Sequence, residues 1–148
     1  MKYCFIVILA LVMNGCSLHF FDSTNARQPG QSQLYQEVGG NEGIARITDA
    51  FIKKIASDPD ILPYFAKSSV SHFRQGFISH LCTSVNGPCE YNSDSMVDIH
   101  TGMNIDEKDF NRVVELLIAA MEDEGIGYST QNKVLKALAP LRSDIIHY

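Results

Sequence analysis

Four stretches of the chain repeat apolar residues every three or four positions, which is the period of a helix with one buried face. They cover residues 41–56, 69–85, 106–124 and 129–146. In the third stretch, for example, Phe110, Val113, Leu117 and Met121 fall on one stripe. No window shows the alternation or the β-branched clusters that are typical of strands. The sequence therefore predicts an all-α fold in a single domain.

Polar and glycine residues mark the expected ends of these helices. Asn41 is the expected N-cap of the first, Ser68 or Ser69 of the second, and Asp106 of the third. The last helix should begin at Ser129 or Thr130. A proline within its apolar pattern, Pro140, should bend it.

The N-terminus has the pattern of an export signal. Lys2 precedes an apolar run over residues 5–13, and Asn14-Gly15-Cys16 follows. The run is too short to span a bilayer permanently, because a spanning helix needs about 20 residues. Gly15-Cys16 resembles the lipobox of bacterial lipoproteins, in which the cysteine after the cut carries a lipid. An ordinary cleavage site somewhat later is the alternative.

These observations predict a signal peptide over residues 1–15, a flexible tether over residues 16–33 and a globular domain over residues 34–148. Export would place the protein in a bacterial periplasm or envelope, and a lipid on Cys16 would attach it to the membrane. In such an oxidising compartment Cys82 and Cys89 are expected to form a disulfide, with two free thiols as the alternative.

Charge excludes one class of partner. The chain has 17 acidic and 12 basic residues, and its formal net charge is −5. No cluster of Lys and Arg is present in the sequence, whereas nucleic-acid binding depends on such clusters to neutralise phosphates. We therefore expect no nucleic-acid partner.

One histidine lies in an apolar setting at the predicted end of a short helix. His100 follows Met96, Val97 and Ile99, and Gly102 comes two residues later. A neutral imidazole binds iron well when a backbone carbonyl or a carboxylate holds its other nitrogen. His100 is therefore a candidate iron ligand. The alternative is an ordinary core or surface histidine.

Several short motifs follow one another along the chain. They are Leu34-Tyr35-x-x-Val38-Gly39-Gly40, Asp58-Pro59-x-Ile61-x-Pro63-Tyr64-Phe65, the segment from Cys82 through Gly87-Pro88-Cys89 to Tyr91, Met96-x-x-x-His100-x-Gly102-Met103-x-Ile105, and Ala139-Pro140-Leu141-Arg142-x-Asp144-Ile145. In this order and spacing the sequence resembles the truncated haemoglobins, most closely their first group. The resemblance covers residues 34–146.

This resemblance implies a two-over-two helical globin that holds one haem b. The family's proximal iron ligand falls on His100, and its haem-contacting phenylalanine falls on Phe65. The other residues expected to line the haem are Phe51, Ile52, Phe73, Phe77 and Leu81 on the distal side, and Met96, Ile99, Val113 and Leu117 on the proximal side. For each of these apolar residues, ordinary core packing is the alternative.

On the distal side the sequence departs from the family pattern. Ile52 stands where the family commonly has a tyrosine, and Phe73 and Phe77 stand where it often has glutamine. An apolar pocket lacks hydrogen-bond donors for bound oxygen, so oxygen storage is not expected. His80 shares a helical face with Phe73 and Phe77, and we hypothesise that it is a distal donor or a sixth iron ligand. The alternative is that His80 lies at the edge of the pocket or in solvent. His72 is a less favoured candidate for the same distal role.

The function implied by the resemblance is binding of a diatomic gas, namely oxygen, nitric oxide or carbon monoxide. Nitric oxide dioxygenation or a peroxidase-like redox reaction is the enzymatic possibility, and it would need an external reductase. A haem-based sensor or interaction lipoprotein of the envelope, without turnover, is the second hypothesis. The third is a globin-derived interaction protein that has lost haem.

Overall fold

The computed structural model describes residues 32–146. The elements are, in chain order, α1 (Gln33–Glu37), α2 (Gly40–Ala56), the 3-10 helix η1 (Leu62–Phe65), α3 (Val70–Ser84), α4 (Met96–His100), α5 (Glu107–Asp123), α6 (Tyr128–Leu138) and the 3-10 helix η2 (Ala139–Asp144). No strand occurs within residues 32–146, so the all-α prediction is confirmed. The predicted signal peptide, Cys16 and the tether up to residue 31 lie outside the described residues.

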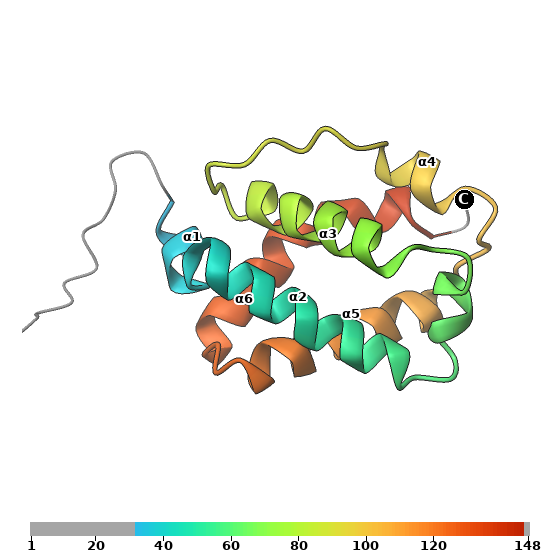
Figure 1. Ribbon diagram of the computed structural model, residues 1–148, viewed down its shortest axis with the longest axis horizontal. Helices are drawn as coiled ribbons and strands as arrows, with labels where there is room; N and C mark the ends of the chain where they lie inside the picture. Colours follow the sequence, from blue (N-terminus) through green and yellow to red (C-terminus); the bar gives the residue numbers. More distant parts are fainter. Residues whose placement is uncertain (1–31, 147–148) are drawn as a thin grey trace, which may run out of the picture.

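The long helices form two pairs. α2 packs against both α3 and α5, and α3 also meets α6 (Figure 1). α1 lies beside α6, and α4 lies beside η2 at the opposite end of the molecule (Figure 1). This is the two-over-two arrangement of α2 and α3 against α5 and α6. None of the described helices is both long enough and apolar enough to cross a membrane.

Glycines fix the start of α2. Gly39 and Gly40 have φ of +87° and +63°, a region that favours glycine because it has no Cβ. A Cβ on Gly43 would lie 1.8 Å from the carbonyl oxygen of Val38, so this close approach also requires glycine. The helix is capped by Gly39, and the expectation that Asn41 caps it is wrong. The paired glycines start the helix before the chain reaches Asn41.

The remaining helix ends follow the sequence more closely. The Ser69 hydroxyl accepts the His72 N–H at the start of α3, and Asp106 and Asp109 form a reciprocal capping box at the start of α5. α1 begins at Gln33 because the Ser32 hydroxyl caps it. Gln33 was expected to belong to the tether.

The last helix differs from expectation at both ends. It begins at Tyr128 after Gly127, one residue before the expected start. It stops at Leu138 and continues as the 3-10 helix η2, where a single bent α-helix was expected. Pro140 has no N–H to donate to the carbonyl four residues earlier, which favours the change to the tighter helix.

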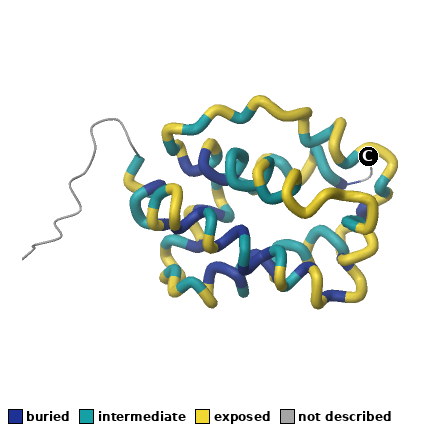
Figure 2. Tube along the Cα trace, in the orientation of Figure 1, coloured by how far each residue is buried: buried dark blue, intermediate teal, exposed yellow. Residues whose placement is uncertain are grey.

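The core lies where α2 meets its neighbours. Figure 2 shows the buried chain concentrated along α2 and the facing parts of α3, α5 and α6. The side chains that are almost completely buried are Val38, Ile44, Ile47, Ile61, Leu81, Val85, Met121 and Val134. Two buried polar groups are satisfied locally: the Thr48 hydroxyl donates to the Ile44 carbonyl, and the Gln131 amide donates to the Ile126 carbonyl.

The turn after α2 is fastened to α5. The Asp58 carboxylate accepts the N–H groups of Asp60 and Ile61 and a 2.7 Å hydrogen bond from Arg112. In η1, the Tyr64 hydroxyl donates to Asp109 at 2.6 Å and thereby raises the pKa of Tyr64 to about 12. The turn that carries η1 is therefore set by polar contacts to the first half of α5.

A disulfide joins the end of α3 to the segment that follows it. Cys82 and Cys89 are bonded, with 5.9 Å between their Cα atoms, and Cys82 is fully buried. A Cβ on Gly87 would lie 2.6 Å from both the Cys82 sulfur and the Tyr35 ring, so only glycine fits inside this loop. The Cys82–Cys89 pairing expected from the sequence is thus present in the structure.

Reducing this disulfide should lower the free energy of unfolding by about 2–3 kcal/mol, because the bond closes a short loop in the unfolded chain. Urea unfolding with and without dithiothreitol measures the difference. The Cys82→Ala/Cys89→Ser variant is the control and should not respond to the reductant. Equal midpoints for the oxidised and reduced protein would contradict the prediction.

Stability should fall on acidification partly through Asp58. Arg112 lowers the pKa of this carboxyl, against the opposing effect of burial, and the Ile61 and Asp60 N–H groups add to the lowering. Since the folded pKa lies below the unfolded value of about 4, the carboxylate stabilises the fold above that value and ceases to do so as pH falls through the folded pKa.

Asp58→Asn should therefore be less stable at pH 7 and should lose less stability than the natural chain between about pH 5 and pH 2. Asp49→Asn is the matched control, because the Asp49 side chain is 46% accessible against 5% for Asp58, so the Asp49–Arg74 pair should matter less. Unfolding midpoints across this pH range would test both variants, and parallel curves for Asp58→Asn and the natural chain would refute the assignment.

Candidate functional site

The geometry of α4 holds the His100 ring in one orientation. The Ser95 hydroxyl caps this short helix by accepting the Asp98 N–H at 3.1 Å. His100 Nδ1 lies 2.7 Å from the carbonyl oxygen of Met96, one turn earlier. A carbonyl can only accept, so Nδ1 carries the proton and Nε2 keeps its lone pair. The ring is therefore prepared to bind a metal through Nε2.

The chain around His100 is poorly covered by the rest of the protein. No residue from 86 to 104 is buried. Met96, Val97 and Met103 are half-buried, and Ile99 is 40% exposed. A helix with this apolar content gains little from its present packing, so a further apolar body could be buried against it.

Aromatic rings from α2, η1 and α3 lie close to one another. Phe73 lies 4.9 Å from Phe65 in η1, 5.6 Å from Phe77 in α3 and 6.4 Å from Phe51 in α2, measured between ring centroids. Phe51 is buried in the core, whereas Phe65, Phe73 and Phe77 are half-buried. Each distance is within the usual range for aromatic pairs, so these rings form one apolar cluster.

The residues predicted to line a haem fall into three groups by exposure. The core holds Phe51, Leu81 and Leu117. Half-buried positions are taken by Ile52, Phe65, Phe73, Phe77, Met96 and Val113, and Ile99 is exposed. The half-buried and exposed members are those with surface still to cover.

His80 is half-buried on α3. Burial is the main cause that lowers the pKa of its imidazole, and a smaller electrostatic contribution from His100 acts in the same direction. His72, the weaker rival, is exposed in the first turn of the same helix.

Two features of the site were not predicted from the sequence. The Tyr91 ring stands edge-on to His80, with 5.2 Å between the ring centroids. The partner of His100 is the Met96 carbonyl, which the four-residue spacing could have suggested. Nothing in the sequence could have suggested the Tyr91 contact, because residues 86–95 have no helical or strand period.

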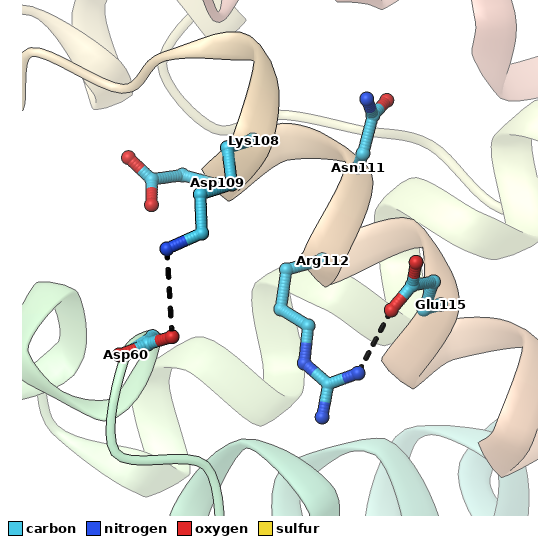
Figure 3. Close-up of a pocket in the computed structure, with 6 residues that line it drawn as sticks. All are labelled: Asp60, Lys108, Asp109, Asn111, Arg112 and Glu115. Carbon is cyan, nitrogen blue, oxygen red and sulfur yellow. Dashed lines mark hydrogen bonds and ion pairs between the residues drawn. The ribbon is translucent and has the colours of Figure 1, made fainter.

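A separate polar pocket of about 470 Å³ lies beside the first half of α5. Figure 3 shows its side chains paired with one another, Lys108 with Asp60 and Arg112 with Glu115. It contains none of the residues predicted for haem contact. Among the described residues no group of three or more His, Cys, Asp or Glu side chains could hold a bare metal ion.

Comparison with known families agrees with this arrangement. The family model for bacterial-like globins matches residues 33–147. The chain belongs to this family. The globin is 26% identical over 116 residues to a group 1 truncated haemoglobin, GlbN, of Nostoc sp. strain MUN 8820, covering 78% of this chain and 98% of that protein. It is 24% identical over 113 residues to that of Tetrahymena pyriformis, covering 76% and 93%.

Solved structures show the same fold. The Fe(III) form of the Tetrahymena pyriformis truncated haemoglobin matches with a TM-score of 0.75 and 23% identity, over 78% of this chain and 98% of that one. The 2/2 haemoglobin of Synechococcus sp. PCC 7002, solved in the cyanomet state with covalently attached haem, matches with a TM-score of 0.73 and 16% identity, over 78% and 98%. The predicted two-over-two truncated globin fold is confirmed.

Haem is the group that globin membership implies, and the residues present fit it. A porphyrin needs an axial base with a free lone pair and apolar surface on both faces. His100 offers the base, the half-buried rings of η1 and α3 offer one face, and Met96 and Ile99 offer apolar surface around the base. When bound, the haem would supply an iron atom able to take up a diatomic gas.

Replacing His100 with glycine should abolish stable haem binding, and added imidazole should restore it by filling the space left by the ring. The Soret absorbance of the purified protein, titrated with haem with and without imidazole, measures this. His72→Gly is the matched control and should bind haem as the natural chain does, because His72 is exposed. Full Soret absorbance of His100→Gly in the absence of imidazole would exclude His100 as the ligand.

Proposed function

We propose that this globin binds oxygen, nitric oxide or carbon monoxide at a haem b iron whose proximal ligand is His100. The observation that carries the proposal is the 2.7 Å hydrogen bond from Nδ1 to the Met96 carbonyl, because it leaves Nε2 available on a helix that has apolar surface still to cover. The partly exposed rings of Phe65, Phe73 and Phe77 support the same place for the porphyrin.

The distal residues argue against oxygen storage. Ile52, Phe73 and Phe77 carry no donor, and a ligand that takes on negative charge is retained by nearby hydrogen bonds. We propose His80 as the polar group on this side, acting as a donor or as a sixth ligand of the iron. Its half-buried position, on the helical face that it shares with Phe73 and Phe77, supports this role.

The reaction that suits such a pocket is removal of nitric oxide. Nitric oxide and oxygen combine to nitrate when one electron is supplied, so a separate reductase must deliver that electron in each cycle. In this proposal the globin is exported to the periplasm or envelope and held there by a lipid on Cys16, and the reductase is its partner. A peroxidase-like reaction would use the same haem and an external electron donor.

Stopped-flow mixing of the reduced, oxygenated protein with nitric oxide tests the reaction. Stoichiometric nitrate, with His100→Gly inactive, supports nitric oxide removal. Stable binding of nitric oxide without nitrate would favour a haem-based sensor or interaction lipoprotein instead. Absence of haem from the protein purified from its host, and failure to take up added haem, would leave only the interaction role.

Ile52→Tyr should slow the release of oxygen by about tenfold or more, because a hydroxyl donated to a partly charged ligand contributes about 1.5–3 kcal/mol. Ile52→Phe is the matched control, since it adds the ring without the hydroxyl and should leave the release rate close to that of the natural chain. Oxygen dissociation rates from stopped-flow displacement by carbon monoxide measure both. Equal rates for the two variants would place this residue away from the ligand.

A further inference from the structure

The segment between α3 and α4 doubles back along α3. In Figure 1 it leaves the end of α3 and returns over the length of that helix to reach α4. The return brings Tyr91 against His80, with an angle of 68° between the planes of their rings. This contact between the rings joins the segment to the side chain of His80.

Tyr91 is held in place by one hydrogen bond of its own and by two links that fix Cys89. Two residues before it, Cys89 is bonded to Cys82 at the end of α3. The Thr83 hydroxyl, on the next turn of α3 after His80, donates to the Cys89 carbonyl at 3.3 Å. The Tyr91 hydroxyl donates to the Asp94 carbonyl at 3.0 Å. These links matter because no residue of this segment is buried, so packing alone would not fix the ring.

A ring at this place restricts the imidazole. A histidine on a helix has few rotamers, and contact with the Tyr91 ring limits which of them the imidazole can adopt. The same neighbour shields one side of the imidazole from water. The helical face on which His80 lies also carries Phe73 and Phe77.

We propose that Tyr91, delivered by the Cys82–Cys89 disulfide, is a positioning residue that keeps the His80 imidazole turned toward the haem. This rests on the proposed role of His80 and adds the group that sets its orientation. The disulfide then acts on the distal side of the iron as well as on stability.

Two spectra of the haem-loaded protein test the proposal. The low-spin fraction of the ferric form reports a sixth ligand, and the C–O stretching band of the ferrous protein under carbon monoxide reports a nearby donor. Tyr91→Ala should shift the population of His80-dependent species by about twofold to tenfold, the range expected for loss of one aromatic contact. Tyr91→Phe keeps the ring and should match the natural chain.

Tyr128→Ala is the matched control, because Tyr128 is 78% exposed and lies on α6. Cys82→Ala/Cys89→Ser should shift the same bands in the same direction as Tyr91→Ala, and it keeps the test informative if that variant folds poorly. The positioning role alone would be overturned if Tyr91→Ala and the cysteine variant gave the same spectra as the natural chain while His80→Ala gave altered spectra. If the spectra of His80→Ala were also unaltered, both the distal role of His80 and the positioning role of Tyr91 would be overturned. The His100→Gly variant tests haem ligation separately.

Discussion

Almost all deep burial in this protein occurs around α2, and α4 takes no part in it. α2 packs against α3 and α5, and its Ile44, Ile47 and Phe51 are buried, whereas no residue between 86 and 104 is buried. Apolar area removed from water is the main source of stability. The helix that carries His100 is therefore weakly supported by burial, and an apolar group bound beside it would add to its stability.

Local links compensate for the missing burial. The Cys82–Cys89 disulfide fastens the start of the segment between α3 and α4 to the end of α3. At the other end of this segment, η2 lies against α4. Between these points Ser95 caps α4, and the Met96 carbonyl orients His100. The site is thus fixed by short-range bonds at its edges, whereas burial contributes little around α4. This division explains why α4 can be open without leaving its histidine ring free to turn.

The sequence was sufficient for the parts of the fold that depend on periodicity. The apolar stripes located α2, α3 and α5 to within one or two residues, and the Ser69 and Asp106 caps were correct. The errors came where backbone geometry decides. Gly39 replaced Asn41 as the cap because left-handed glycines start the helix early. At Pro140 the chain changes to a 3-10 helix, because the missing N–H of a proline can be accommodated by a change of helix type as well as by a bend.

The candidate site was predictable on the side of His100 and much less so on the side of His80. A histidine and its carbonyl partner lie on one turn of helix, so sequence spacing is enough to relate them. His80 and Tyr91 meet only because the segment between α3 and α4 reverses along α3. A segment whose sequence has neither the helical nor the strand period gives no indication of the path it takes. Local geometry thus defines how the iron would be held, and long-range geometry defines what it would meet. The second is where this globin departs from its family's pattern, since the residues expected on the distal side, Ile52, Phe73 and Phe77, are apolar, and the polar group proposed there is the His80 imidazole.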